Sequence, residues 1–498
     1  MKLRAIFANS GIPLWIDVAS YLKEKYDWEI IYFIGSSSMK NYALGKFPDA
    51  VFHTNAEAKI NSIPTACKAI KASPLDQNLI LRLAQDVSVI IKMLDRNDLY
   101  GDFTLQKRLI YCHSQIMYWI GVIEFFKPDV VVFRTAPHMP FDYALYAACK
   151  IKGIKTIMFE NTAFLGRILP VTSFSEGSPA LKENFRNMLK KYGEDNQKSI
   201  VLSDEIKKHI ETLGKSYNQS MPFPLKYKLS HYKNGHIGGN LDISFNIIKD
   251  IIKGVFVKYK DKDYLRKKFY RNIGLFKTNR LTSHYNRIAK EPDFNSPYIF
   301  VALQCEPERQ TVPCGGAFIN QYLMVDLLSK TIPETWKIYV KEHISQFKSY
   351  QKAYLGRSFE FYDYIVSLPN VEFVPLSYTS FDLIDASIAS ATVSGSVGWE
   401  SVVRGRPSFL FGHAWYKDCE GVFCTSEKSR LIDAIDAIKD GYSPDRNKVL
   451  LFAKALEATS FKGAINPLIE KAGTVSHKEN VSNFAESINS FMESFPAI

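Results

Sequence analysis

The chain has 498 residues, of which 46% are hydrophobic and 23% are charged. This length predicts two or three domains, and the composition is that of a globular protein with ample core. The formal net charge of +12 suits anionic partners, which include nucleic acid, anionic lipid, and phosphorylated or carboxylated sugars. The basic residues form neither a compact block nor a zinc-finger spacing, so we expect no nucleic-acid partner.

The cysteines and the apolar runs indicate a cellular compartment. Seven scattered cysteines form no CxxC pair, which is typical of reduced thiols in the cytosol. The first 15 residues lack the apolar core of a signal peptide. Long apolar runs such as residues 116–126 are too short to span a bilayer and contain a glutamate. We therefore expect a cytoplasmic protein, with any membrane contact at the surface of the inner membrane.

The N-terminal region begins as an open parallel sheet. Residues 3–7 and 28–34 are predicted strands, and residues 14–26 between them form a predicted helix. The loop that begins at Gly35 is not a GxGxxG motif and does not indicate a dinucleotide site. Residues 55–125 are predicted to be mostly helical.

Polar residues follow the next two predicted strands. The apolar run 128–133 is typical of a buried parallel strand and leads to His138, and residues 153–159 form a strand that ends at Glu160 and Asn161. Ligands of open α/β sheets bind at the carboxyl ends of strands, so His138 and Glu160 are candidate acid and base groups. An exposed loop histidine and a helix-capping acid are the structural alternatives.

Residues 171–295 differ in composition, being polar, rich in lysine and poor in strand pattern. Residues 217–240 read as a linker because they are rich in Gly, Pro, Asn and Ser. Residues 243–271 mix apolar and basic residues at helical spacing, which predicts a basic amphipathic surface. Both a membrane contact and a solvated helical connection fit this pattern.

A second α/β unit begins at residue 297. Its predicted strands are residues 297–303, 336–340, 371–374 and 391–393. Each is followed by polar residues, namely Gln304 to Arg309, Lys341 to His343, Ser377, and Ser394 to Glu400. Four polar strand ends in one unit would meet at one edge of the sheet, where cations, hydroxyl groups and a helix start suit a nucleotide phosphate and a sugar acid.

The turn at Ser394, Gly395 and Ser396 is the most informative of these strand ends. A helix is predicted from Val397 to Val403, and the next strand covers residues 408–411. Exposed N–H groups at such a helix start can receive a phosphate or carboxylate, and the serine hydroxyls add donors. A serine-capped helix start in any α/β domain is the alternative. No HxxH, HExxH or DxD spacing lies near these strand ends, so we expect no metal and no cofactor.

These motifs resemble those of bacterial capsular and lipopolysaccharide glycosyltransferases of the GT-B type. The resemblance covers residues 128–165 and 296–425 as short motifs, and it is strongest to retaining β-Kdo transferases and related enzymes that use CMP-activated ulosonic or nonulosonic acids. The motifs are Gln304-Cys-Glu-Pro-Glu308, Lys341-Glu-His343, Ser394-Gly-Ser-Val-Gly-Trp-Glu400, Gly405-Arg-Pro407, Phe411-Gly412 and Phe159-Glu160-Asn161.

The resemblance implies an α/β fold with two Rossmann-like parallel-sheet domains that face each other across a cleft. Residues 1–170 would form the acceptor-side domain and residues 296–425 the donor-binding domain. Residues 171–295 would be a basic, largely helical connection. Residues 426–498 would be helices that pack back across the domain pair.

The resemblance also implies roles for the matched residues. Glu160 would be the general base or acid for the acceptor hydroxyl, and Glu308 stands where the family has a nucleophilic aspartate. His343 would be the third catalytic residue and would bind the donor phosphate or carboxylate. The remaining positions would bind the donor (Gln304, Arg309, Lys341, Ser377, Ser394, Gly395, Ser396 and Glu400) or face the acceptor (His138 and Asn161).

Three positions depart from the family pattern. Glu308 is one methylene longer than the expected aspartate, Ile344 replaces a proline, and Trp399 replaces a smaller aliphatic residue unless it belongs to the core. These departures favour a branch that uses a different acidic sugar, such as pseudaminic acid.

Three functions fit the sequence. The first is the transfer of Kdo or a nonulosonic acid from a CMP-sugar donor to a glycan or lipid-linked glycan acceptor, with retention. The second is a GT-B transferase that uses a UDP- or GDP-hexose. The third is a non-catalytic polysaccharide-binding protein of capsule assembly.

Overall fold

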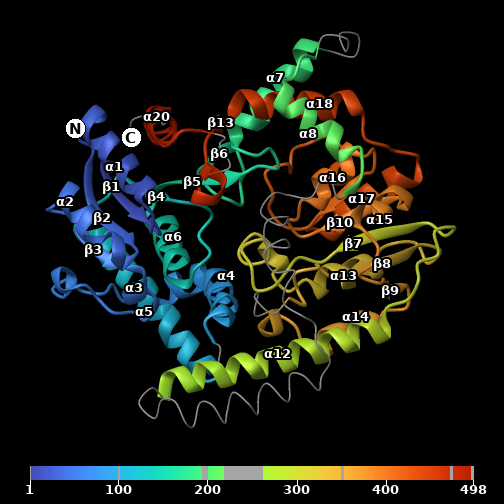
Figure 1. Cartoon of the computed structure of the whole chain (residues 1–498), viewed down its shortest axis with the longest axis horizontal. Helices are drawn as coiled ribbons and strands as arrows, with labels where there is room; N and C mark the ends of the chain where they lie inside the picture. The colour runs from blue at the N-terminus through green and yellow to red at the C-terminus, as the bar shows by residue number, and fades with distance from the viewer. Residues whose placement is uncertain are drawn as a thin grey trace.

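The computed structural model describes residues 2–98, 101–192, 200–217, 262–348, 353–471 and 475–494. It consists of two α/β halves, and the long helix α12 (Lys262–Ile288) runs along one edge of the molecule (Figure 1). Two predicted segments lie partly outside the described residues. These are residues 243–261 of the predicted basic segment and residues 218–240 of the predicted linker.

The first half is built on a seven-stranded sheet with the order β13-β6-β5-β4-β1-β2-β3. Five of these strands are parallel and follow the Rossmann order 3-2-1-4-5, whereas β6 and β13 are antiparallel to their neighbours. The strands are β1 (Arg4–Ala8), β2 (Glu29–Gly35), β3 (Val51–Thr54), β4 (Val130–Phe133), β5 (Lys155–Asn161), β6 (Arg167–Val171) and β13 (Phe461–Lys462).

Helices cover both faces of this sheet, which explains why its central strands are continuous apolar runs. Helices α1 (Pro13–Tyr26) and α20 (His477–Glu493) pack together on one face, while α4 (Gln77–Met93), α5 (Leu105–Phe126) and α6 (Pro140–Lys152) cover the other. The C-terminal end of the chain therefore returns to complete the first half (Figure 1).

The second half is built on a fully parallel six-stranded sheet with the order β12-β11-β10-β7-β8-β9. This is the Rossmann order 3-2-1-4-5-6, with the direction of winding reversed between β7 and β10. The strands are β7 (Tyr298–Ala302), β8 (Lys337–Lys341), β9 (Val371–Phe373), β10 (Ala389–Thr392), β11 (Ser408–Leu410) and β12 (Val422–Cys424). Two Rossmann-like sheets that face each other form the α/β architecture of the GT-B type.

In the second half, a helix follows each of the strands β7 to β10 along the chain. Helices α7 and α8 extend from the first half to the second, where they contact α18 and α16 respectively. The bounds are α7 (Pro179–Tyr192), α8 (Asp204–Leu213), α13 (Tyr322–Ser329), α14 (Phe359–Val366), α15 (Ser380–Ala386), α16 (Val397–Val403), α17 (Lys428–Lys439), α18 (Arg446–Thr459) and α19 (Pro467–Lys471). The short helices α2 (Lys40–Lys46) and α3 (Asn55–Lys59) belong to the first half.

Most predicted strands agree with the structure within one or two residues, and α16 has its predicted bounds of Val397 and Val403. Glu160 differs, because β5 continues to Asn161 instead of ending at residue 159. The cause is the antiparallel neighbour β6, which pairs Glu160 with Leu169 and extends the ladder. Glu160 therefore lies within the last residues of the strand, at its carboxyl end.

None of the described helices is both long enough and apolar enough to cross a membrane. All seven cysteines lie in the described part of the chain, and each is a free thiol.

Candidate active site

The two sheets bring their switch points toward each other. In the second half, the loop after β7 reaches the first half, where Arg96 Nη2 donates a hydrogen bond to the Val312 carbonyl at 2.8 Å. Lys92 Nζ, on α4 of the first half, lies 3.7 Å from Glu306 Oε2 in the same loop. Ligands of doubly wound sheets bind at such switch points, so these loops enclose the candidate active site.

Asp142 organises the switch point of the first half. Its Oδ2 accepts a hydrogen bond from Asn9 Nδ2 at 2.9 Å, and its Oδ1 accepts one from the Met139 N–H at 2.7 Å. Burial raises the pKa of Asp142 to about 7 against these hydrogen bonds. Asp142 thereby joins the loop after β1 to the start of α6. Asn9 has a φ of 55°, a left-handed conformation that asparagine tolerates well.

Two arginines lie next to Asp142 with unused donors. Burial lowers the pKa of Arg96 to about 10, although Glu308 and Asp142 counteract it, and burial also lowers the pKa of Arg134. The Nε atoms of both arginines are buried and have no hydrogen-bond partner within the described residues. Buried donors without partners cost free energy, so both arginines are suited to receive an anionic ligand.

His138 lies close to these arginines in a neutral state. Burial, together with Arg96 and Arg309, lowers the pKa of His138 to about 3. Its Nδ1 is 3.1 Å from the Ala136 carbonyl oxygen, which can only accept, so Nδ1 carries the proton and Nε2 a lone pair. At neutral pH, His138 is better suited to accept a hydrogen bond from a ligand hydroxyl than to exchange a proton.

Glu160 has the properties of a general acid or base. Burial raises the pKa of Glu160 to about 7, although the positive charges of Arg309 and Lys417 counteract this rise. Both of these cations belong to the second half, so Glu160 faces the opposite sheet. Lys417 Nζ donates to the Ser175 carbonyl at 3.1 Å and also to the Glu176 carbonyl. A carboxyl group with a pKa near the working pH is effective in proton transfer.

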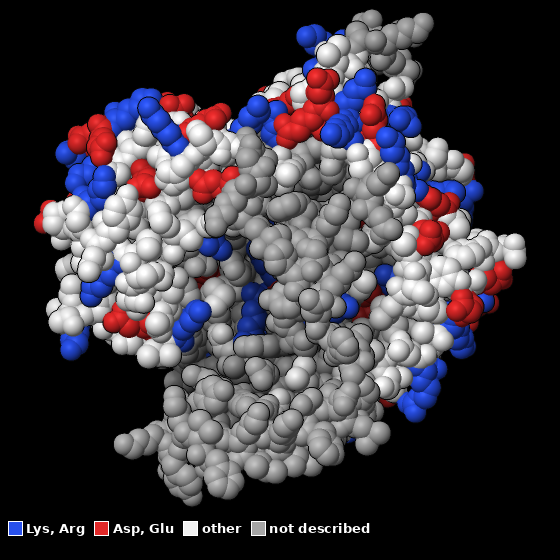
Figure 2. Space-filling model, in the orientation of Figure 1, with Lys and Arg blue, Asp and Glu red and all other residues white. Residues whose placement is uncertain are grey.

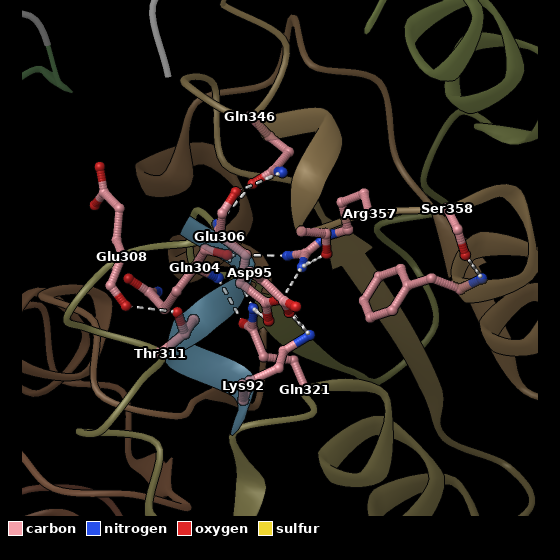
Figure 3. Close-up of polar contacts among 12 residues, drawn as sticks. Lys92, Asp95, Gln304, Glu306, Glu308, Thr311, Gln321, Gln346, Arg357 and Ser358 are labelled. Carbon is pink, nitrogen blue, oxygen red and sulfur yellow. Dashed lines mark hydrogen bonds and ion pairs between the residues drawn. The ribbon is translucent and has the colours of Figure 1, made fainter. Parts of the chain in front are cut away.

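The motif from Gln304 to Glu308 is held by a buried polar network (Figure 3). Gln321 Oε1 accepts from the Gln304 N–H at 2.7 Å, and Gln321 Nε2 donates to Glu306 Oε1 at 2.8 Å. Gln346 exchanges two hydrogen bonds with the backbone of Glu306, at 2.8 and 3.0 Å. Gln304 thus has a structural role, because its backbone N–H and carbonyl and its side-chain amide all bond within the protein.

Arg357 is the centre of this network. Its side chain has no exposed surface and lies 3.1 Å from Glu306 Oε2 and 2.8 Å from Glu342 Oε2. Burial acts to lower the pKa of Arg357, but Glu342 and Glu306 outweigh it and raise the pKa. The guanidinium group also lies over the ring of Phe361, 4.3 Å from its centroid. The loop after β7 is therefore fastened to the end of β8 through a buried ion-pair triad.

Glu308 has a different environment from Glu306. Figure 3 shows the Glu308 side chain pointing away from the Arg357 network. Its carbonyl accepts hydrogen bonds from the N–H and Oγ1 of Thr311, at 3.1 and 2.8 Å. The carboxylate is close enough to Arg96 to counteract the lowered pKa of that residue. Of the two glutamates in the motif, Glu306 is bound in the Arg357 network, and the Glu308 side chain lies outside that network.

The turn after β10 uses its serine side chains inside the protein. Ser394 Oγ bonds to the Gln310 carbonyl and lies 3.1 Å from Gln310 Oε1, while Ser396 Oγ donates to Glu400 Oε1 at 2.7 Å. Burial raises the pKa of Glu400, which is 8% exposed. A Cβ atom on Gly395 would lie 2.1 Å from Gln304 Nε2, so a larger residue there would displace the hydrogen-bonded Gln304 side chain. Through Ser394 and Gln310, the turn positions the loop after β7.

Trp399 belongs to the contact between the two halves. Its side chain is fully buried, with its ring centroid 5.8 Å from that of Phe164 in the first half and 5.1 Å from that of Trp415. The large residue at this position therefore fills an interface core.

The remaining predicted residues lie at the ends of β8, β9 and β5. Burial lowers the pKa of Lys341 at the end of β8. His343 Nδ1 accepts a hydrogen bond from the Ser345 N–H at 3.1 Å, which leaves the proton of the neutral ring on Nε2. Ser377 is exposed in the turn after β9, and Asn161 is the last residue of β5.

Sequence reasoning missed four residues of the site, namely Arg96, Arg134, Asp142 and Lys417. Arg134 directly follows β4, so the strand-end rule applied to Glu160 also points to it. The other three have no local signal, because their neighbours at the site come from distant segments. Across the described ranges, no group of three or more His, Cys, Asp or Glu side chains could hold a metal ion.

Comparison with known proteins adds solved structures of low similarity. Neither a protein-family model nor a curated protein matches the chain. The UDP-GlcNAc 2-epimerase from Neisseria meningitidis is 14% identical, with 92% of this chain and 99% of that chain covered and a TM-score of 0.24. KpsC, a β-Kdo 2,7 transferase from Thermosulfurimonas dismutans, is 8% identical, with coverage of 71% and 88% and a TM-score of 0.29. The calicheamicin glycosyltransferase CalG4 is 10% identical over 100% of both chains, with a TM-score of 0.22. At these TM-scores the likeness has no bearing on substrate or mechanism.

Proposed function

We propose that this protein is a glycosyltransferase of capsule or lipopolysaccharide synthesis that transfers an acidic sugar from a CMP-sugar donor to a glycan hydroxyl. The sugar would be Kdo or a nonulosonic acid such as pseudaminic acid. The observation that carries the proposal is the environment of Glu160. This carboxyl group, with a pKa of about 7, lies at the carboxyl end of β5 and is influenced by cations of the opposite sheet.

The charges around the cleft support an anionic donor. A CMP-activated ulosonic or nonulosonic acid carries both a phosphate and a carboxylate. The site contains three arginines that lower the pKa of His138, namely Arg96, Arg134 and Arg309, and Arg309 also lowers the pKa of Arg134. Figure 2 shows Lys and Arg side chains inside the hollow between the two halves. Guanidinium groups recognise carboxylate and phosphate through paired hydrogen bonds.

The proposed chemistry uses two carboxylates from opposite halves. Glu308 attacks the anomeric carbon of the donor, CMP leaves with the electrons of the broken C–O bond, and a glycosyl ester forms. Glu160 then removes the proton from the acceptor hydroxyl, whose oxygen attacks the same carbon and releases Glu308. Two displacements give retention of configuration, and neither requires a metal or cofactor. The reaction would take place in the cytoplasm, at the inner membrane when the acceptor is lipid-linked.

Binding of free nucleotides tests the donor. We expect CMP to raise the midpoint of thermal unfolding more than UDP, GDP or TDP at equal concentration, because binding only to the folded state stabilises it. Differential scanning fluorimetry measures the shift. Stabilisation by UDP or GDP without stabilisation by CMP would contradict the CMP-sugar proposal and favour a GT-B hexose transferase.

Replacing Arg309 with glutamine should move the pH profile of transfer. Arg309 lowers the pKa of Glu160, so its loss should raise that pKa above about 7. Because the base form of Glu160 is the active one, the rising part of the profile of kcat/KM should move to higher pH. Arg430→Gln is the control, since it removes an equal charge from an exposed ion pair on α17. An unchanged profile in Arg309→Gln would show that Arg309 does not lower the pKa of Glu160.

A further inference from the structure

A second cavity, of about 520 Å³, lies between the two halves. This volume is within the range of about 300–1,000 Å³ that is typical of small-molecule sites. Helices α4 and α6, the amino end of β5, the segment that follows the carboxyl end of β6, and loops of the second half form its wall. The lining residues used below are Gln85, Asp86, Tyr146, Lys150, Glu176 and His413.

The cavity shares a wall with the Glu160 site. Lys417, whose charge lowers the pKa of Glu160, donates hydrogen bonds to the carbonyls of Ser175 and Glu176, and both of these residues line the cavity. Cys314 lies between the lining residues Pro313 and Gly316, and the charge of Glu160 contributes to the raised pKa of its thiol. The cavity lies at the amino end of β5, about 13 Å along the strand from Glu160, and Lys417 connects the two.

The polar groups of the cavity wall are held in place and balanced in charge. Asp86 is 5% exposed and accepts hydrogen bonds from Lys150 Nζ, at 2.7 and 3.0 Å, and from the Tyr143 hydroxyl, at 3.1 Å. The Tyr146 hydroxyl lies 2.9 Å from Ser173 Oγ. The wall contains two lysines, Lys150 and Lys155, and two acidic residues, Asp86 and Glu176. Unlike the arginine-rich Glu160 site, this cavity does not favour an anion.

His413 adds an uncharged hydrogen-bonding group. Burial, together with the charge of Lys417, lowers the pKa of His413 to about 4, so the ring is neutral at pH 7. Its centroid lies 5.9 Å from that of Phe174, another lining residue. A Cβ on Gly316 would lie 2.9 Å from His413 Nε2, so glycine leaves room for the ring. A neutral imidazole offers one donor and one acceptor, as a sugar hydroxyl does.

We propose that this cavity binds a neutral sugar unit of the acceptor glycan, farther along the glycan from the unit whose hydroxyl is glycosylated. The proposal rests on the proposed transferase function and identifies the acceptor side of its site. Hydroxyl, carboxylate and imidazole groups of the wall, together with the aromatic side chains of Phe174 and Tyr146, match the hydroxyl groups and the apolar faces of a neutral sugar.

The test is a substitution that fills the mouth of the cavity. Gln85 is exposed on α4, so Gln85→Trp should block the cavity without breaking a buried contact. Ala84→Trp is the matched control, because Ala84 is exposed on the same helix and does not line the cavity. The probes are lactose, maltose and chitobiose, with N-acetylneuraminic acid as an anionic sugar, all measured by saturation-transfer NMR in the presence of CMP.

We expect at least one neutral disaccharide to bind the unmodified protein and Ala84→Trp, and to bind Gln85→Trp at least tenfold more weakly. The proposal is overturned if none binds, if Gln85→Trp binds equally well, or if only the anionic sugar shows the dependence on Gln85. The thermal shift with CMP, measured on the same samples, reports the donor site. A CMP shift without disaccharide binding refutes the cavity proposal alone, whereas disaccharide binding without a CMP shift refutes the CMP-sugar donor.

Discussion

Replacing Glu160 with glutamine should reduce sugar transfer by about 10²- to 10⁴-fold, the usual contribution of a general acid or base. Glutamine keeps the size of the side chain but cannot take the proton of the acceptor hydroxyl. CMP release and glycan product, measured together at saturating donor, check the result. Glu211→Gln, an exposed substitution on α8, should leave transfer unchanged.

The pH dependence gives a second measure of Glu160. With a pKa of about 7, the base form of Glu160 accumulates as pH rises, so kcat/KM should increase through about pH 7 and level off above it. Burial raises the pKa of Glu160 above the ordinary value of a glutamate. The folded state therefore loses stability as pH rises from that ordinary value to about 7, where the buried group becomes charged. Glu160→Gln should thus unfold at the same or a higher temperature than the unmodified protein at pH 8. Full activity in a folded Glu160→Gln protein would refute the assignment.

Replacing Arg357 with methionine should lower the free energy of unfolding by about 3–5 kcal/mol, as expected when one member of a buried ion pair is removed. The change leaves Glu306 and Glu342 buried without their shared cation. Chemical denaturation and the thermal midpoint measure the loss. Arg430→Met removes an exposed arginine from a surface pair and should change stability by no more than about 0.5 kcal/mol.

A combined variant separates the charge of Arg357 from its packing. Adding Glu306→Gln and Glu342→Gln to Arg357→Met removes the two uncompensated carboxylates and should recover part of the lost stability. Such recovery shows non-additivity among contacting residues. If Arg357→Met alone is as stable as the unmodified protein, the buried triad does not hold the loop after β7.

The sequence predicted the parallel sheets because their central strands are buried on both faces. Residues 130–133 and 299–302 are uninterrupted apolar runs, and the structure contains β4 and β7 there. The short strands β3, β6, β12 and β13 were not predicted. A strand as short as Phe461–Lys462 depends on its pairing with β6, which belongs to a segment far away in the chain.

The same limit applies to the site. The strand-end rule placed Glu160 at the carboxyl edge of the first sheet and Ser394 in the turn after β10, since parallel strands end at one edge. It did not identify Arg96, which has no local sequence signal and reaches the site through the packing of the two halves. It also did not show that Ser394 and Ser396 bond to Gln310 and Glu400.

The residue types at the strand ends can be read from the sequence, and they predict a candidate site with carboxylates and cations between two parallel sheets. Only the tertiary structure decided how each of these groups is used. Glu306 and Glu308 belong to one motif, yet Glu306 is ion-paired with Arg357, whereas the charge of Glu308 acts to raise the pKa of Arg96. Burial and ion pairing depend on partners that are distant in the chain, and these partners set the environment of each carboxylate.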